Sequence, residues 1–382
     1  MTTTDVTAVP ATTSHRGSPI PTGAMIMTRF MELRKRRGLM IALLAVNIGV
    51  PTLFLVVRLI AHAVAPHSYG PAGGYSIFED LIAGLMYIFG FIVAATLGCT
   101  AGSVDLTEGM FRHLVVTGRS RLALYFARIP AGLMIIVPVV AAGIIIVCSV
   151  CVVAAPTKLS FDGISNMPAG LSRQGFLTWA EDHPKLTICE LGYRYQGGPN
   201  TPNQVQCGPN NEVVVVNNQA GSITATPATK AEMRNQAIKS AEQNYKSYAT
   251  TFLSPPVKLM IETGLWVELW AVIGFLVGLG LSSLMGQRTV PVVLLIVYEI
   301  VLTPLFSRNA IPHLINAQRA LVGLAMVHIE PAGLPAVFGG GRGGGGGGQI
   351  LPESTTVAVI VIIAWIVVWT ALGAWRMSKR DA

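Results

Sequence analysis

Charged residues are scarce in this sequence. Asp, Glu, Lys and Arg make up 12% of the 382 residues, whereas a soluble domain usually has about 25%. Hydrophobic residues make up 52%, and the mean hydropathy is +0.56. Apolar stretches of about 20 residues, the length needed to cross a bilayer, recur along the chain. These features exclude an ordinary soluble protein and predict several membrane spans.

The sequence also lacks the usual signatures of catalysis. It contains no G-x-x-x-x-G-K-[ST] loop for phosphate and no H-E-x-x-H pair for zinc. Residues 339–348 are nearly all glycine without the Lys-Ser/Thr of a nucleotide loop, so a flexible loop is expected there. The seven His residues are scattered, and no Ser-His-Asp set can be assembled. We therefore expect no enzyme activity, metal or cofactor in this chain itself.

Lys and Arg outnumber Asp and Glu, which gives a net charge of +8, and they are placed unevenly along the chain. About six precede the first predicted span, about four fall in 112–128, one is Arg288 and three follow the last span. With six spans these segments share one side, and positive charge in short loops marks the cytoplasm. A cell-membrane protein with cytoplasmic termini is predicted. The sequence has no basic patch interleaved with aromatic residues, so it gives no indication of nucleic-acid binding.

The predicted fold is an all-α membrane protein with six transmembrane helices, an N-terminal amphipathic elbow helix and a small extracellular α+β domain inserted between spans three and four. The spans are expected at 39–62, 77–101, 122–153 (core 131–153), 264–284, 289–306 and 355–375. The predicted divisions are a disordered tail (1–23), elbow and spans one to three (24–155), the insert (156–262), and spans four to six (263–382) with an outer re-entrant segment (308–330).

The insert is polar and long enough to form a small domain. A strand is expected at 190–196, a hairpin from 212–216 and 222–226, and a helix at 228–249. Cys189 and Cys207 bracket a loop rich in Gly, Pro and Asn. A disulfide between them is predicted, because such bonds persist on the oxidising side of a membrane. Two free thiols are the alternative, and no nearby residue completes a metal site.

Three ionisable residues fall inside predicted spans. Glu299 lies near the middle of span five, Glu268 in the outer part of span four and Arg58 in the outer part of span one. Intramembrane charge is costly and usually functional, so a polar substrate path is one interpretation. The other is structural: either glutamate pairs with Arg58 or with a backbone group to hold the bundle together.

Residues 102–121 form a polar island between two apolar runs. Leu106, Met110, His113 and Leu114 have helical spacing, which predicts a short amphipathic helix at the membrane surface. Asp105 and Glu108 lie early in this helix, as its dipole favours. A solvated loop helix without a partner is the plain alternative.

These residues resemble the cytoplasmic loop of type-2 ATP-binding-cassette (ABC) exporter permeases. Asp105 and Glu108-Gly109 take the acidic and glycine places, and Ser120-Arg121 takes the Ser-Arg place before the third span. Met110 stands where Thr is common, and Gly118 near where Pro is common. The resemblance extends to the elbow helix, six spans and re-entrant segment, but such a long insert is not typical of the family.

The resemblance implies an export permease without its own ATP site. ATP and Mg²⁺ would bind two copies of a separate ABC ATP-binding subunit, and the permease would pair with itself or a related chain. The helix within 102–121 would be the coupling helix, and the elbow a second contact. The implied ATPase contacts are Asp105, Glu108, Gly109, Arg112, Ser120 and Arg121, with Glu32, Arg34 and Arg36 on the elbow. An amphipathic or hydrophobic substrate is expected.

Two other classes of function remain open. A membrane-anchored receptor or sensor would use the insert as a ligand domain. A polytopic enzyme would cluster His, Asp or Glu at one membrane face. A neighbouring gene for a Walker-motif ATPase would favour the transporter.

Overall fold

The computed structural model describes residues 18, 20–65, 69, 71–107, 120–157, 159–161, 164–168, 170–191, 204–208, 212–219, 222–249, 253–307, 317–332, 334 and 353–379. The chain forms two compact units. The helical unit comprises Met1–Val57, Glu79–Ser149 and Val257–Ala382. The insert unit comprises Arg58–Phe78 and Val150–Pro256.

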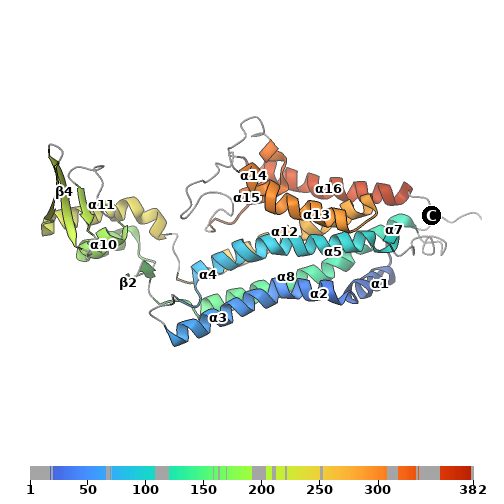
Figure 1. Cartoon of the computed structure of the whole chain (residues 1–382), viewed down its shortest axis with the longest axis horizontal. Coiled ribbons are helices and arrows are strands. Elements are labelled where there is room, and N and C mark those ends of the chain that lie inside the picture. Colours follow the sequence, from blue (N-terminus) through green and yellow to red (C-terminus); the bar gives the residue numbers. More distant parts are fainter. Residues whose placement is uncertain are drawn as a thin grey trace, which may run out of the picture. The chain divides into compact units, whose positions relative to one another are not determined.

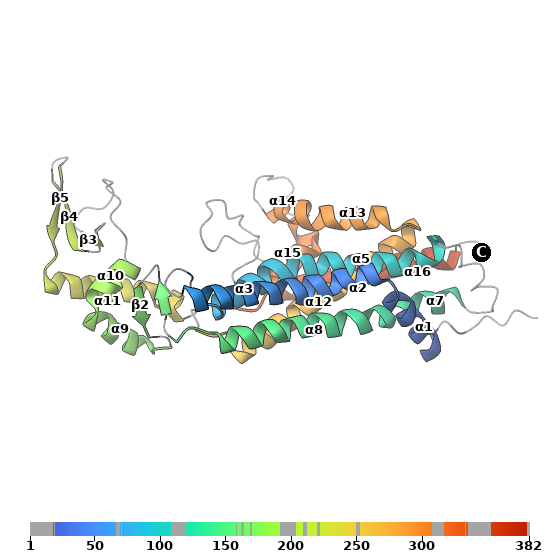
Figure 2. The same ribbon diagram turned by 60° about the horizontal axis from the view of Figure 1, so that its bottom comes forward.

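Within the residues that the structure describes, six helical segments are long and apolar enough to cross a membrane, as predicted. The long helices run side by side (Figure 1; Figure 2). The six segments are Arg37–Val64, Tyr75–Asp105, Arg121–Val153, Val257–Met285, Thr289–Ser307 and Thr355–Lys379. Their elements are α2 (Arg37–Leu44), η1 (Ala45–Gly49), α3 (Val50–Val64), α4 (Tyr75–Glu79), η2 (Asp80–Met86), α5 (Tyr87–Thr107), α7 (Arg121–Phe126), α8 (Arg128–Val153), α12 (Val257–Met285), α13 (Thr289–Val297), η3 (Tyr298–Leu302), α14 (Thr303–Ser307) and α16 (Thr355–Lys379).

Two helix boundaries differ from those predicted. Helix α12 begins at Val257, ahead of the expected start near 264, directly after Pro255-Pro256. Its first turns can contain charged residues because Lys258 and Glu262, one turn apart, form an ion pair with 3.7 Å between Nζ and Oε1. Helix α5 continues to Thr107, beyond the predicted end of span two near 101, because buried ion pairs accommodate Asp105 at its polar end.

Helices α5 and α12 form the centre of the helical unit. In an apolar 18-residue stretch of each span, 72% of the residues are buried in α12 and 61% in the span that contains α5. The corresponding share is 22% in the first and last spans. The two helices meet backbone to backbone. A Cβ atom on Gly98 would lie 2.1 Å from the Phe275 carbonyl oxygen, and one on Gly278 would lie 2.4 Å from that of Ala95. Such small-residue contacts let membrane helices pack closely.

A short helix, α15 (Val322–His328), packs against α16 and α14. Aromatic side chains fix its backbone. Trp266 Nε1 donates to the Met326 carbonyl oxygen over 2.9 Å, and the Gly323 amide donates to the Tyr298 hydroxyl over 3.1 Å. Together with a 3₁₀ turn at 317–320, α15 is the described part of the predicted re-entrant segment. Residues 308–316 and the glycine loop 339–348 lie outside the described residues.

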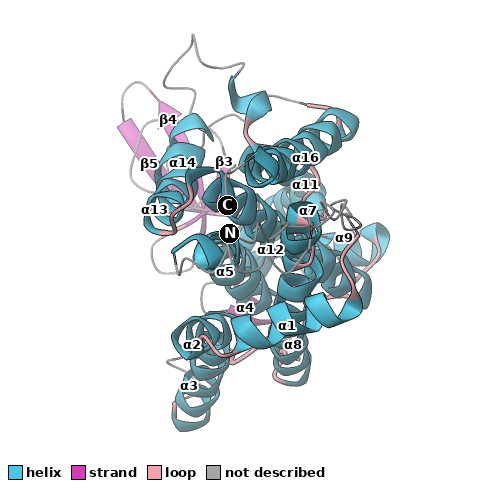
Figure 3. Ribbon diagram, turned by 90° about the vertical axis from the view of Figure 1, so that its right-hand side faces the viewer, coloured by secondary structure: helices cyan, strands magenta, loops and turns pink. Residues whose placement is uncertain are grey.

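Helix α1 (Gly23–Arg34) corresponds to the predicted elbow. Seen along the bundle, it lies across the helix ends (Figure 3). Its inner face is Met25, Arg29 and Leu33, all buried at a four-residue spacing. Met25 packs against α7, whereas Met31 is 41% exposed.

The insert unit combines helices with two small antiparallel sheets. The predicted hairpin is confirmed by the pairing of β4 and β5, and the predicted helix by α11, which starts at a Thr229–Glu232 capping box. Hydrogen bonds from Thr229 lower the pKa of Glu232. The elements are β1 (Leu159–Phe161), β2 (Ile164–Met167), α9 (Arg173–Asp182), α10 (Pro184–Leu191), β3 (Gln204–Cys207), β4 (Val213–Gln219), β5 (Ser222–Pro227) and α11 (Lys230–Ala249).

The disulfide between Cys189 and Cys207 is confirmed. It joins α10 to β3 inside a small core with Ile188, Val213 and Ala237. In place of the strand predicted at 190–196, residues 190 and 191 end α10, and 192–196 lie outside the described residues. A helix forms here because Pro184 is favoured in a first turn, and the helix then carries Cys189 to its partner.

Candidate functional site: a buried charged cluster at one end of the bundle

A cluster of buried charges lies at the end of the second span. Asp105, in the last turns of α5, is 1% exposed. Its two carboxylate oxygens accept hydrogen bonds from Arg29, over 2.7 Å from Nη1 and 2.6 Å from Nη2. This two-point geometry is the strongest arrangement for a guanidinium and a carboxylate. It fixes α1 to α5.

Arg128 approaches the same carboxylate from the third span. It is fully buried near the start of α8 and donates to Asp105 through Nη2. Its Nη1 donates to the Gly102 carbonyl oxygen over 3.0 Å, and the Ser283 hydroxyl donates to that oxygen over 3.2 Å. Arg128 therefore joins α8 to α5, and Ser283 adds α12.

Glu32 balances the charge of the cluster. Its carboxylate lies 2.6 Å from Arg29 Nη1, one turn along α1. Burial alone lowers the pKa of Arg29, but the Asp105 and Glu32 carboxylates outweigh it, so that this pKa is raised. The cluster thus combines two basic and two acidic side chains. A buried cluster of this kind is rigid, because removing one member leaves another unpaired.

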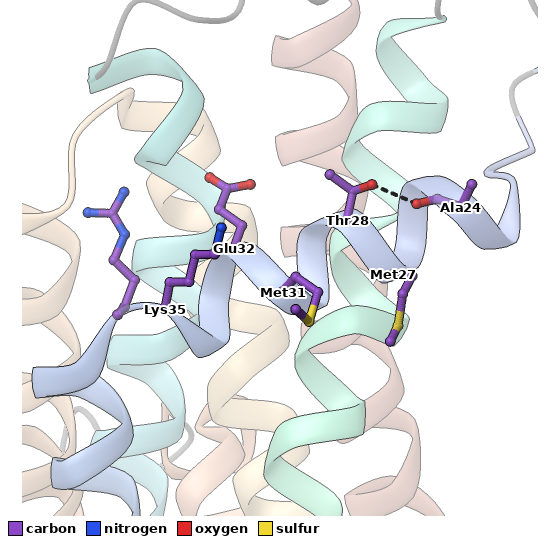
Figure 4. A pocket seen from close by; sticks show the side chains of 7 residues that line it. Ala24, Met27, Thr28, Met31, Glu32 and Lys35 are labelled. Carbon is purple, nitrogen blue, oxygen red and sulfur yellow. Dashed lines mark hydrogen bonds between the residues drawn. The ribbon is translucent and has the colours of Figure 1, made fainter.

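The outer face of α1 is open. An accessible groove of about 760 Å³ is lined by the side chains labelled in Figure 4 together with Arg36. Met27 and Met31 supply its apolar part, and both are exposed. Glu32 and Lys35 supply charge. Flexible methionines flanked by charge are common at protein-binding surfaces, so this face can receive a partner while the inner face holds the spans.

The residues expected to contact an ATPase have different positions. Asp105 is buried in the cluster, and Glu108, Gly109 and Arg112 lie outside the described residues. Ser120 caps α7 by accepting a hydrogen bond from the Ala123 amide over 3.1 Å. Arg121 donates to the Ser378 carbonyl oxygen over 3.3 Å, which ties the start of α7 to the end of α16.

The elbow residues that were expected to bind a partner divide between the faces of α1. Glu32 joins both the buried cluster and the open groove. Arg34 is exposed, and Arg36, at the start of α2, lines the groove.

The intramembrane charges do not join the cluster. Glu299 lies in the π-helical turn η3 with 1% exposure, and neither carboxylate oxygen accepts a hydrogen bond within the described part of the chain. Glu268 Oε1 is also buried without a partner among the described residues. Arg58 donates to the Pro71 carbonyl oxygen over 2.9 Å. Within the described ranges no ion pair involves either glutamate.

Sequence reasoning missed Arg29 and Arg128. Each carried a signal: Arg29 shares the apolar face of its helix with Met25 and Leu33, and Arg128 is an isolated charge in an apolar run. The glycine pairs Gly98/Gly102 and Gly274/Gly278 were also missed, although their four-residue spacing is typical of close helix packing in membranes.

Comparisons with known proteins leave the family open. No family model, curated protein or solved structure matches this chain. Across the residues that the structure describes, no group of three or more His, Cys, Asp or Glu could hold a metal ion. Proposals about function therefore rest on the geometry of the helical unit and on the resemblance of residues 102–121.

Proposed function

We propose that this chain is the membrane permease subunit of an ABC exporter, which moves an amphipathic or hydrophobic substrate outward. Two copies of a separate ATP-binding subunit supply the energy and bind ATP and Mg²⁺. The permease chain pairs with a second copy or a related chain in the cell membrane. Six apolar helices and a helix lying across their ends support this proposal.

The observation that carries the proposal is the Arg29–Asp105–Arg128 cluster. It joins α1 to the end of the second span and the start of the third. These two spans flank 108–119, which belong to the expected coupling segment. Because buried ion pairs fix the geometry, a force on α1 or on the coupling segment reaches both spans together. A rigid link of this kind is what an external ATPase requires.

In this proposal the cluster faces the cytoplasm and the insert unit lies outside the cell. The end of α16 then lies on the same side as the start of α7, since Arg121 contacts Ser378. The disulfide supports an external insert, because disulfides persist on the oxidising side. The insert would cap the exit or bind an external partner.

Purification of the tagged chain in mild detergent tests the proposal. We expect an ATP-binding subunit to copurify with the wild-type chain and to hydrolyse ATP. Reversing two charges of the coupling segment, by Glu108→Lys with Arg112→Glu, should abolish this recovery. The matched control is Arg173→Glu, an exposed charge on the insert unit, which should leave recovery unchanged.

Recovery of the chain without any nucleotide-binding protein would contradict the proposal. A receptor or sensor that uses the insert as its ligand domain would then be the better account, because the insert is a compact unit with its own core.

A further inference from the structure

An apolar groove between α8 and α12 contains a single carboxylate. Its volume is about 450 Å³, within the usual range of small-molecule pockets, roughly 300–1,000 Å³. Helix α8 contributes Val137, Ala141 and Ile144, and α12 contributes Met260, Leu265 and Glu268. Apart from Glu268, the lining is apolar except for the Cys148 thiol and the Ser149 hydroxyl, which donates to the Ile145 carbonyl oxygen over 2.7 Å. The groove thus offers one charged group in apolar surroundings.

Glu268 lies inside the fourth span, nearer to its Val257 end. At 1.5 Å per residue, it is about 17 Å from the Val257 end of α12 and about 26 Å from the Met285 end. The hydrocarbon core of a bilayer is about 30 Å thick, so both ends of this helix extend close to or beyond its limits. Glu268 also lies six residues, about 9 Å, beyond Glu262 of the charged pair with Lys258, in the apolar part of the span, where an unpaired charge is costly.

One oxygen of this carboxylate is left unsatisfied by the described part of the chain. Glu268 Oε1 is buried and accepts no hydrogen bond there. The contrast with Glu262 is direct, since Glu262 lies on the same helix and pairs with Lys258 at 3.7 Å. A carboxylate that the protein leaves unpaired in an apolar groove is complementary to a cation that brings its own apolar body.

We propose that this groove binds hydrophobic amines. The protonated amine lies against Glu268, and the hydrocarbon lies along Val137, Ile144 and Leu265. Attraction between opposite charges is strong in this apolar part of the span because little water screens it. A bilayer phospholipid fits poorly, because its headgroup belongs at the membrane surface. The inference deepens the proposed export function by naming a substrate class, and it rests on that function only for the transport step after binding.

Direct binding to the full-length chain tests the inference. The chain is placed in nanodiscs of phosphatidylcholine, and binding of radiolabelled dodecylamine and dodecanol is measured. We expect saturable amine binding and at least about tenfold weaker binding of the alcohol, which has the same chain without the charge. Glu268→Gln should weaken amine binding by about tenfold or more, and Glu262→Gln should leave it unchanged.

A second variant tests the groove itself. Ala141→Phe places a ring in the groove and keeps the carboxylate, so it should weaken binding of both probes. Size-exclusion chromatography checks that each variant remains folded. Equal amine binding by wild type and a folded Glu268→Gln chain would overturn the inference, as would equal affinity for amine and alcohol.

The two proposals can fail separately. Amine binding without a copurifying ATPase would refute the permease and leave the groove intact. A copurifying ATPase without amine binding would refute the groove alone.

Discussion

The Arg29 guanidinium and the Asp105 carboxylate face each other through two hydrogen bonds, of 2.7 and 2.6 Å, although 76 positions separate them in the chain. Arg128 binds the same carboxylate from a third helix. One buried acid therefore holds an N-terminal helix and two spans. In the proposed exporter this contact carries movement from the ATPase side of α1 into the membrane.

The cluster should be a large source of stability. Asp105→Asn preserves the shape of the side chain but leaves the buried Arg128 guanidinium without its counter-charge and Arg29 with only the partly exposed Glu32. We expect the free energy of unfolding, measured by denaturant titration in micelles, to fall by about 3–5 kcal/mol. Glu32→Gln is the control, because Glu32 is 24% exposed and its loss should cost less than about 1 kcal/mol. Similar losses in both variants would count against a rigid buried cluster.

The contact between α5 and α12 should tolerate no side chain at Gly98. A Cβ atom there would lie 2.1 Å from a backbone oxygen, which can move only if the helices separate. We expect Gly98→Ala to lower the free energy of unfolding by about 1–3 kcal/mol. Gly84→Ala, on the same span with nothing within 4 Å of the new atom, should be neutral or stabilising by up to about 1 kcal/mol. Equal free energies of unfolding for Gly98→Ala and Gly84→Ala would contradict the close packing of α5 against α12.

The disulfide should stabilise the insert unit specifically. Cys189 and Cys207 are 18 positions apart, and closing a loop of that length is worth about 3 kcal/mol. Replacing both by Ala should expose the insert to protease at a lower temperature, as measured by pulse proteolysis of the full chain. Cys148→Ala, a free cysteine of the helical unit, should leave that temperature unchanged. An unaltered profile in the double variant would show that other contacts hold the insert.

Much of the fold follows from local pattern. Runs of apolar residues located the six spans, because a helix in lipid must be long and apolar whatever it packs against. Cys189 and Cys207 were predicted to pair because they bracket a loop expected on the oxidising side of the membrane, and the turn residues 217–221 between two short runs predicted the hairpin of β4 and β5. The helical conformation of residues 190–191 was missed. Pro184 at the start of α10 and the disulfide from Cys189 to Cys207 outweigh the strand propensity of these residues.

The charged cluster could not be predicted in the same way. Asp105 was expected at a surface, because a carboxylate in a polar stretch is usually solvated. Its burial depends on Arg29 and Arg128, which lie 76 and 23 positions away, and hydropathy contains no information about such pairs. The close approach of α5 to α12 was readable in the spacing of glycines, but which helices would meet was not.

Crosslinking from the outer face of α1 tests the central claim most directly. A photoreactive residue at Met31 on α1 would be compared in cells with one at Val293 on α13, since both positions are exposed in this chain. The account predicts that Met31 crosslinks to a nucleotide-binding subunit, identified by mass spectrometry through its Walker motif, and that Val293 does not. Crosslinks from Met31 to lipid alone, or to proteins without a nucleotide site, would contradict the claim that an ATPase docks at this end of the bundle.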